Sequence, residues 1–315
     1  MSATSSVSLH LPSLAWTSLS DWQAIAVTGA DSKSYLQGQV TCDVVQLDTE
    51  HSTLGAHCDA KGKMWSLFRL FRLFHHNQGY ALWQHKSGIE TALQEIKKYS
   101  VFSKVDLELS SQISIGVLGE QADSFIDSIT DGQGDVRSIA SGSAIKIDSQ
   151  RWLLLVNEDE LESLKPQLQN AEEISADAWD YVDVVNGIPR VIQSQQNTHI
   201  PQTLNLQALD GINFEKGCYT GQETVARAKY RGTNKKVMRL LQGTANENAA
   251  FTFERQVGEN WRGAGEAIAQ YRNQQGEALA LIVLNKDIEF DTQFRLAGDT
   301  TNTWSLVELP YDIEQ

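Results

Sequence analysis

Cysteine is scarce in this chain: its 315 residues include three cysteines, Cys42, Cys58 and Cys218, and these lie far apart. A disulfide framework needs more cysteines, and a structural zinc or iron–sulfur site needs closely spaced ligands such as a CxxC pair. No CxxC pair is present, and the seven histidines include no HxxxH or HExxH spacing. The sequence therefore indicates neither a disulfide-stapled domain nor a metal site.

Long apolar runs and nucleotide-binding glycine motifs are also missing. No apolar run approaches the ~20 residues of a membrane span, and the first twenty residues contain neither Lys nor Arg, unlike a signal or transit peptide. GxGxxG and Walker sequences are absent, so neither a dinucleotide nor an NTP site is supported. With 41% hydrophobic residues the chain can bury sizeable cores, and we expect a soluble, cytoplasmic protein of two or three domains.

Positive charge is concentrated in one segment of an otherwise acidic chain. Residues 216–239 contain seven basic residues and one acid, a balance of +6, whereas the whole chain carries −14 and the remainder therefore −20. The basic residues are Lys216, Arg227, Lys229, Arg231, Lys235, Lys236 and Arg239. Such a cluster favours an anion site or a docking strip over nonspecific nucleic-acid binding. The alternative is a solvated basic face that pairs with nearby acids.

A single segment combines a thiol with glycines and a cation. It reads Lys216-Gly217-Cys218-Tyr219-Thr220-Gly221-Gln222-Glu223. A thiol reacts as the thiolate, which a neighbouring cation favours, and glycines allow other molecules to approach the backbone closely. Cys218 is therefore the candidate functional thiol. The alternative is that the glycines only shape a turn and Cys218 is a small buried apolar side chain.

Local patterns predict a strand and two capped helices near the start of the chain. A strand over 23–27, with Trp22 at its mouth, precedes a short helix capped by Asp31. Ser87 and Glu90 have the spacing of a capping box, and apolar residues recur behind them at helical spacing. We therefore expect a helix after Ser87.

Two apolar stretches predict a β-hairpin between these helices. Residues 67–74 and 79–83 are strongly apolar, and the polar residues 75–78 separate them. His75 and His76 fall in this polar break, which we interpret as a turn.

A second unit follows with the same order of strand and helix. Residues 113–117 alternate as a strand, and 122–129 have helical spacing. Residues 152–156 form another apolar strand, and Asn157 begins a second capped helix. A Gly/Ser/Asp-rich stretch, 131–143, separates the two modules. This pattern predicts an α+β layer, with helices on one face of a mainly antiparallel sheet.

In the last part of the chain, a predicted helix is followed by short strands. Ser175 begins a predicted helix that carries Trp179 and ends at Gly187 and Pro189. After residue 240 short strands alternate with polar turns, which favours a small β-barrel or sandwich.

Five segments of the chain form a recognisable set: the octapeptide from Lys216 to Glu223, DAKGKMW at 59–65, GQVT at 38–41, YSVFSK at 99–104 and NLQAL at 205–209. Together they resemble the bacterial YgfZ family of folate-binding, tRNA-modifying proteins. The resemblance runs through nearly the whole chain, and the octapeptide is typical of YgfZ and its mitochondrial relatives in iron–sulfur protein maturation. It implies the fold of aminomethyltransferase, the T-protein of the glycine cleavage system: an α+β body with mainly antiparallel sheets around a central folate cavity, plus a small C-terminal β-barrel.

The resemblance also implies site residues and domains. Trp22 and Trp179 match the tryptophans that line the family's folate site, and Cys218 matches the family cysteine. The implied domains are a discontinuous folate-cavity body over 1–104 and 176–239, an inserted α+β domain over 105–175 and a barrel over 240–315. Flat indole faces suit a pterin and an aminobenzoyl ring, and a cation suits the glutamate tail.

One departure from aminomethyltransferase bears on activity. That enzyme carries a pair of aspartates shortly after its matching glycines, whereas residues 61–74 contain no Asp or Glu. Without a positioned acid or base, proton transfer loses a factor of roughly 10²–10⁴. The T-protein reaction is therefore not expected, and the residues favour a non-enzymatic role.

We accordingly expect a monomeric accessory protein that binds a tetrahydrofolate derivative and supports tRNA modification, through iron–sulfur enzymes that thiolate or methylthiolate tRNA. Direct tRNA binding stays open. The alternatives are a folate-dependent one-carbon transferase that uses Cys218 as nucleophile, and an interaction scaffold with a vestigial cavity. Turnover of a tetrahydrofolate derivative would select the transferase, and absence of folate binding would select the scaffold.

Overall fold

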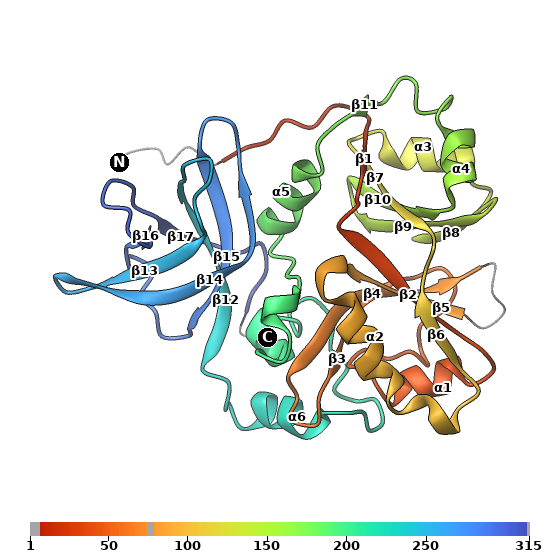
Figure 1. Ribbon diagram of the computed structural model, residues 1–315, viewed down its shortest axis with the longest axis horizontal. Helices are drawn as coiled ribbons and strands as arrows, with labels where there is room; N and C mark the ends of the chain where they lie inside the picture. The colour runs from red at the N-terminus through yellow and green to blue at the C-terminus, as the bar shows by residue number, and fades with distance from the viewer. Residues whose placement is uncertain (1–6, 75–78, 314–315) are drawn as a thin grey trace.

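A computed structural model describes residues 7–74 and 79–313 as three sheets with helices packed around them (Figure 1). The first sheet has five antiparallel strands in the order β3 (Thr53–Cys58), β4 (Met64–Leu73), β5 (Gly79–His85), β2 (Trp22–Thr28) and β6 (Asp106–Leu109). The second has six strands in the order β11 (Glu172–Glu173), β1 (Ala15–Ser18), β7 (Ile113–Leu118), β10 (Arg151–Val156), β9 (Gly142–Asp148) and β8 (Val136–Ile139). Only its β1–β11 pair is parallel among the strand pairs of the described residues.

The third sheet closes into a C-terminal barrel. Its order is β16 (Phe294–Leu296), β13 (Thr252–Val257), β14 (Asn260–Arg272), β15 (Glu277–Asn285), β12 (Lys236–Thr244) and β17 (Ser305–Val307). Phe294 and Trp304 exchange two backbone hydrogen bonds, of 2.9 and 2.7 Å, and this bridge joins β16 to the residue before β17. The two edge strands thereby cover each other, as closure of a barrel requires.

Six α-helices surround these sheets in the described residues: α1 (Ser32–Gln37), α2 (Ile89–Lys97), α3 (Ala122–Ile129), α4 (Glu158–Leu164), α5 (Asp177–Val185) and α6 (Gln222–Tyr230). Short 3-10 turns occupy Lys86–Gly88, Ser100–Phe102, Gln193–Gln195 and Pro201–Leu204. In Figure 1, α5 lies between the barrel and the other two sheets. Within the described ranges, no helix is long and apolar enough to cross a membrane.

Apolar periodicity located most of these elements correctly. The predicted hairpin is β4 and β5, with Leu70 opposite Leu82, and its connection at 75–78 lies outside the described residues. The predicted α2, α3 and α5 are also present. The Gly/Ser/Asp-rich stretch 131–143 was wrongly interpreted as a mere separator, since it contains β8 and the start of β9. Pairing with β9 orders this short segment, which has too few apolar residues to reveal itself.

The predicted helix caps, in contrast, are not made by side chains. Ser87 lies within a 3-10 turn, where its N–H donates to His85 Nδ1, so the capping box predicted with Glu90 does not form. Asp31 does occupy the N-cap position of α1, but its carboxylate accepts the N–H of Lys104 at 2.7 Å. The capping patterns therefore predicted where the helices begin, but they did not predict the hydrogen bonds that the capping side chains make.

Strand pairing crosses the boundaries drawn from the sequence. β1 precedes residue 104 but pairs with β7, and β6 follows residue 105 but pairs with β2. The barrel sheet starts at Lys236, ahead of the expected boundary at 240. Each of the first two sheets thus contains a strand from the other side of the expected boundary at 104–105, and the division into three domains stays a prediction.

His57 on β3 is a buried base without a hydrogen-bond partner among the described residues. Its side chain is 2% exposed, and neither ring nitrogen has a partner. Burial, with a smaller contribution from Lys98, lowers the pKa of His57 to about 4. The folded protein therefore holds this imidazole neutral, whereas the unfolded chain protonates it near its ordinary value of about 6.5.

We expect acid to destabilise the fold through His57. Above about pH 6.5 His57 is neutral in both the folded and the unfolded state and does not affect the free energy of unfolding. As pH falls from about 6.5 towards 4, the unfolded state takes up the proton first, and the free energy of unfolding decreases, by about 2 kcal/mol at pH 5. Urea unfolding of His57→Leu should show a flatter pH dependence than the parent over this range. His51→Gln is the control, because His51 is exposed and its hydrogen bond to Asp48 raises its pKa. Equal pH dependence of parent and His57→Leu would contradict the assignment.

Candidate functional site

Three tryptophans from three elements meet between the first two sheets. Trp22 begins β2, Trp83 lies on β5 opposite Ala24, and Trp179 lies on α5. Trp22 and Trp83 stack with ring centroids 4.3 Å apart and planes 16° apart, and Trp83 meets Trp179 edge-on at 6.1 Å. The two predicted residues, Trp22 and Trp179, are therefore brought together by a third indole. We call these three side chains the tryptophan cluster.

Trp179 is locked into place by its surroundings. Its side chain is 1% exposed, and a Cβ added to Gly116 on β7 would lie 2.7 Å from its ring. Gly116 is thus required for the indole to lie on the sheet. The Arg151 guanidinium covers the same ring at 4.6 Å from the centroid, a distance at which a cation is attracted by an indole face. Trp179 is therefore a fixed wall of the site.

Charged side chains form a buried network next to the cluster. Asp183, one turn after Trp179 on α5, accepts from Arg151 Nη1 at 2.8 Å and faces Arg190 Nη2 at 3.5 Å. Arg151 also binds Asp148 at 2.8 Å. Burial alone would lower the pKa of Arg151, but the carboxylates of Asp183 and Asp148 outweigh it and raise that pKa. Arg190 lies 5.2 Å from the ring centroid of Trp22 and binds Asp180 at 2.7 Å.

The pocket between these groups is rich in unused hydrogen-bond donors. Trp179 Nε1 and Arg190 Nε, on two residues that line the pocket, are buried without an acceptor among the described residues. Arg151 Nη2 also has no acceptor there, but Arg151 lies over the Trp179 ring and is not part of the pocket lining. Arg69 also lines the pocket; its Nη1 donates to Ser52 Oγ at 3.1 Å, and burial lowers the pKa of Arg69 to about 10. Buried donors in native proteins are normally paired with protein, water or ligand. The pocket is therefore suited to a group that accepts hydrogen bonds.

The pocket is closed in this conformation. Its free volume is about 20 Å³, enough for roughly one water molecule. A flat bicyclic ring can enter only if a lining side chain moves. Trp22 is the candidate, because it is half-buried whereas Trp83 and Trp179 are almost fully buried.

Sequence reasoning missed most of this pocket. Trp83, Arg69, Asp183 and Arg190 of the lining were not singled out, and neither was Arg151, which contacts Trp179 and Asp183. The signal for the arginines was present, because Arg69 interrupts an apolar strand and Arg151 begins one. A charged residue in such a strand must find a partner or a cavity when the strand is buried.

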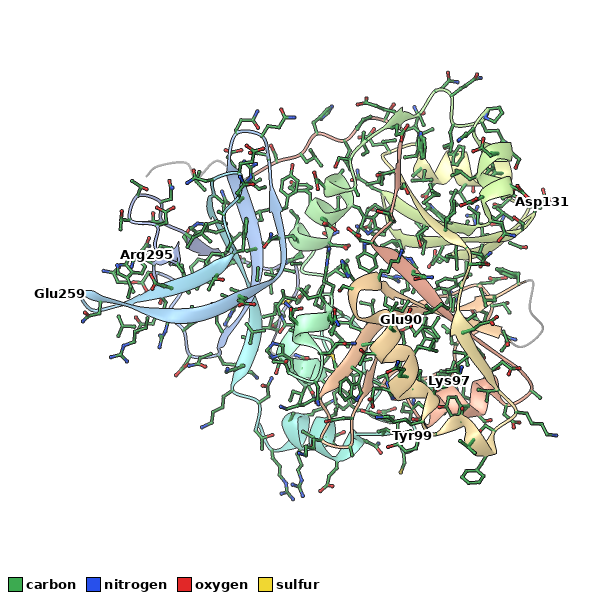
Figure 2. The ribbon with its side chains drawn as sticks, in the orientation of Figure 1. Glu90, Lys97, Tyr99, Asp131, Glu259 and Arg295 are labelled. Carbon is green, nitrogen blue, oxygen red and sulfur yellow. The ribbon has the colours of Figure 1, made fainter. Side chains whose placement is uncertain are left out.

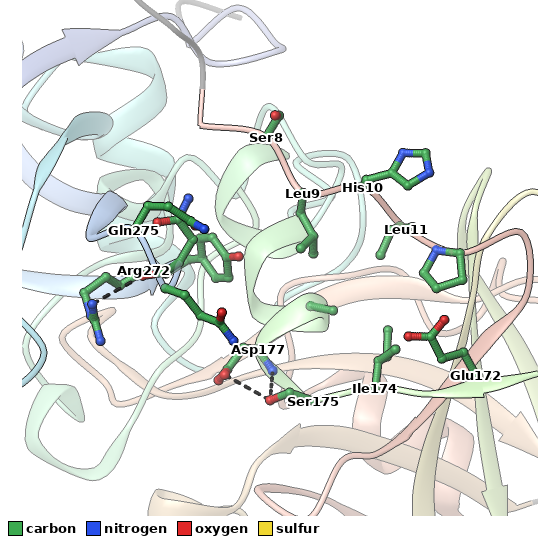
Figure 3. Close-up of a pocket in the computed structure, with 15 residues that line it drawn as sticks. Ser8, Leu9, His10, Leu11, Glu172, Ile174, Ser175, Asp177, Arg272 and Gln275 are labelled. Carbon is green, nitrogen blue, oxygen red and sulfur yellow. Dashed lines mark hydrogen bonds between the residues drawn. The ribbon is translucent and has the colours of Figure 1, made fainter.

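A larger hollow of about 400 Å³ lies elsewhere, between the N-terminal segment, the start of α5 and the β14–β15 turn (Figure 3). Its lining mixes polar and apolar side chains; Asp177 and Ser175 are hydrogen-bonded to each other, and Arg272 is bonded to Asn273. Among the described residues, none of the buried donors that lack a partner lines this hollow, in contrast to the tryptophan pocket.

The octapeptide forms a loop that presents Cys218 to solvent. Lys216 is buried, and its Nζ donates to the carbonyls of Val40 and Cys42 at 2.7 and 2.6 Å. Burial lowers the pKa of Lys216 to about 8. Tyr219 is also buried, whereas Cys218 is exposed. Lys216 therefore anchors the loop, a different role from the activation of Cys218 that its sequence position suggested.

Two of the motif segments touch through their glycines. Gly62 and Gly221 both have positive φ, +77° and +84°. A Cβ on Gly221 would lie 2.5 Å from Asp59 O and 2.9 Å from Gly62 Cα. Thr220 joins a third motif, since its N–H donates to Gly38 O at 3.2 Å. The segments 38–41, 59–65 and 216–223 thus form one packed unit around the base of the Cys218 loop.

The first three basic residues after the octapeptide are Arg227, Lys229 and Arg231, and we call them the basic strip. Two of them already contact other side chains. Arg227 pairs with Glu223 at 2.5 Å, and Lys229 Nζ lies 3.8 Å from the ring centroid of Phe214. Arg231, at the end of α6, is exposed. The residues that line the tryptophan pocket include none of the octapeptide or the strip. The structure therefore separates the predicted site residues into two groups: Trp22 and Trp179 at the tryptophan pocket, and Cys218 with the basic strip away from it.

Comparison with known proteins identifies the family. "tRNA-modifying protein YgfZ" of Vibrio atlanticus is 52% identical to this chain over 309 residues, which cover 97% of the chain and 94% of that relative. The chain belongs to the YgfZ family. YgfZ proteins of Aliivibrio fischeri and Serratia proteamaculans are 49% and 39% identical, over 96% and 98% of this chain and 94% and 96% of their own lengths. The resemblance seen in the five segments is thereby confirmed.

The YgfZ assignment agrees with the architecture. The family model of the YgfZ β-barrel domain matches residues 234–299, which start just before β12. The crystal structure of glycine cleavage system aminomethyltransferase T from Bartonella henselae superposes with a TM-score of 0.70 at 12% identity, over 96% of this chain and 87% of that chain. At this identity the likeness shows the fold. The predicted α+β class, T-protein-like architecture and C-terminal barrel are confirmed, and the roles of individual site residues stay predictions.

Proposed function

We propose that this protein binds a reduced folate in the tryptophan pocket and supports tRNA modification in the cytoplasm, by maintaining iron–sulfur enzymes that thiolate or methylthiolate tRNA. The observation that carries the folate part is the meeting of three indoles with two unpaired buried donors, Trp179 Nε1 and Arg190 Nε, at one pocket. The name of the relatives, tRNA-modifying protein YgfZ, supports the part on tRNA modification.

The chemistry of a folate matches what the pocket offers. Its pterin and aminobenzoyl rings can stack on indoles, and the pterin carbonyl and glutamate carboxylates accept hydrogen bonds. Trp22 and Trp179 would hold the rings, while Trp179 Nε1, Arg190 Nε and Arg69 would donate to the acceptors. Because the pocket has a free volume of about 20 Å³, Trp22 must leave Trp83 when the ligand enters.

A one-carbon transferase that uses Cys218 as nucleophile is less well supported. A nucleophile must lie within reach of the bound one-carbon unit, and Cys218 is absent from the residues that line the pocket. Residues 61–74 also contain no carboxylate. We therefore assign Cys218 to the support of a partner enzyme.

We expect a tetrahydrofolate derivative to quench tryptophan emission, and Trp22→Ala to raise its Kd by at least about tenfold. Loss of one stacking ring costs about 0.5–1.5 kcal/mol of binding free energy, in addition to the free energy lost because its apolar area is no longer buried. Titration of 5-formyltetrahydrofolate, followed by fluorescence and calorimetry, measures the Kd. Trp261→Ala is the matched control, because Trp261 is also half-buried beneath an arginine, Arg295 at 4.4 Å, but lies in the barrel. Parent-like binding by Trp22→Ala would place the folate site elsewhere.

A further inference from the structure

Large exposed apolar side chains gather on one side of the molecule. In the part of the chain that the structure describes, six such residues are exposed. Five of them, Val45, Tyr99, Val101, Phe102 and Tyr230, lie on segments next to α1 and the Cys218 loop, and the sixth, Phe290, lies in the barrel. Phe102 and Val101 are 98% and 79% exposed. An apolar group of this kind on a soluble domain typically marks an interaction site.

Hydrogen bonds connect these residues to the Cys218 loop through α1. Gln37, at the end of α1, accepts the N–H of Val45, and the next residue, Gly38, accepts the N–H of Thr220. The Tyr35 hydroxyl on α1 donates to Ile96 O, close to Tyr99 in sequence. Figure 1 shows α1 and α6 along the same edge, and Figure 2 shows Tyr99 at that edge, far from Glu259 and Arg295 of the barrel. We call this surface the Cys218 face.

The most exposed part of the Cys218 face is held in place. Residues 100–102 form a 3-10 turn, closed by a 2.9 Å bond from Ser103 N–H to Ser100 O. Lys104 N–H then donates to Asp31 at 2.7 Å, and Lys104 O lies so close to Gly29 that a Cβ there would be 2.4 Å away. Phe102 is therefore presented by a fixed backbone, which reduces the entropy that a partner must remove.

Gly217 leaves open space beside Cys218. A Cβ on Gly217 would meet no atom of the chain within 4 Å, and its φ lies outside the left-handed region. The fold itself therefore does not require glycine at this position. A partner that approaches the Cys218 loop closely would require it.

The charges around the Cys218 face favour an acidic protein. Residues 97–104 contain three lysines and no acid, in a chain of net charge −14. RNA binding draws its affinity from many phosphate contacts, but Arg227 and Lys229 of the basic strip are already engaged. Valines and an exposed phenylalanine instead resemble the apolar centre of a protein interface with a polar rim. A second copy would bring the same lysines face to face in a symmetric dimer.

We propose that the Cys218 face is the docking surface for a protein whose own face is apolar at the centre and bordered by carboxylates. Phe102 and Val101 fill the partner's apolar centre, Lys97 and Lys104 meet its carboxylates, and Gly217 lets it cover the thiol of Cys218. This inference deepens the proposed function, because the docked protein is then the partner that Cys218 serves.

Alkylation of Cys218 tests whether a partner covers it. The protein, pure or added to a desalted extract of cells that lack it, is treated with N-ethylmaleimide, and alkylation of the Cys218 peptide is timed by mass spectrometry. We expect slower alkylation in the extract, with protection that survives RNase and disappears when the extract is digested with protease. Protection that RNase removes would assign the face to RNA. Protection that grows with the concentration of pure protein would assign it to a second copy, and no protection would leave it without a partner.

Matched variants locate the contact. Val101→Ser with Phe102→Ser should raise the extract concentration that gives half-protection by about 30-fold, equivalent to ~2 kcal/mol. Phe290→Ser changes another exposed phenylalanine, 58% exposed and in the barrel, and should leave the half-protection concentration unchanged. Gly217→Val should also abolish protection without lowering Tm. Gly263 on β14 has similar open space, and Gly263→Val should leave both protection and Tm unchanged. Equal behaviour of each variant and its control would overturn the proposal.

Analysis of tRNA nucleosides in a strain that carries Cys218→Ala separates this inference from the proposed function. If protection behaves as expected but tRNA nucleosides in the Cys218→Ala strain match the parent, docking stands and the proposed role of Cys218 fails. If nucleosides are lost in the Cys218→Ala strain but no protein protects the thiol, the docking proposal fails and the function stands.

Discussion

Cys218→Ala is expected to abolish support of tRNA modification while folding and folate binding stay intact. The thiol is exposed and its side chain is small, so its removal leaves little cavity. The loop is held by Lys216, Tyr219 and Gly221, whose contacts do not involve Cys218. The tryptophan pocket contains no atom of this loop. Function should therefore be lost without a change in stability.

Nucleoside analysis of tRNA measures this effect. Thiolated and methylthiolated nucleosides in the Cys218→Ala strain should fall to the level of a strain that lacks the protein, with parent Tm and folate Kd. Cys42→Ala is the contrasting control: burial raises the pKa of Cys42 to about 12, and the side chain packs in the core of the first sheet. That variant should lower Tm, and it should reduce tRNA modification only as far as it reduces the amount of folded protein. Full modification with Cys218→Ala would remove the functional assignment of this residue.

The sequence predicted elements better than it predicted contacts. Apolar spacing located the β4–β5 hairpin and α2 because that periodicity is a local property of the chain. The hydrogen bonds of Ser87 and Asp31 could not be predicted, because each residue could bond to several polar groups. The tertiary fold decides which of these groups lies within reach. Hydrogen bonds that depend on tertiary placement are outside the range of local patterns.

The same limit applies to the two candidate sites. Trp22 and Trp179 came from a family resemblance, but Trp83 completes the cluster only because β2 and β5 pair in one particular register. Lys216 is two residues from Cys218 in sequence, yet its ammonium turns to the carbonyls of Val40 and Cys42. Neighbours in sequence share a loop, while the direction of each side chain is fixed by packing.

Asp183→Ala is expected to destabilise the fold by about 3–5 kcal/mol, because it leaves buried positive charge without its partner. Arg151 is completely buried and would keep Asp148 as its remaining carboxylate. Arg190, which is also buried, would keep Asp180. The expected loss is large compared with that from a surface ion pair, whose worth is about 0–1 kcal/mol.

Urea unfolding of the ligand-free protein tests this expectation. Asp127→Ala is the matched control, because Asp127 pairs with Arg137 at 2.6 Å but is 63% exposed. The two changes remove the same carboxylate from ion pairs of similar length, so a difference in unfolding midpoint reports the effect of burial. Similar midpoints for the two variants would contradict the assignment. A large difference would instead mean that Asp183, which also lines the tryptophan pocket, fixes the buried arginines and so holds the wall on which Trp179 and its ligand depend.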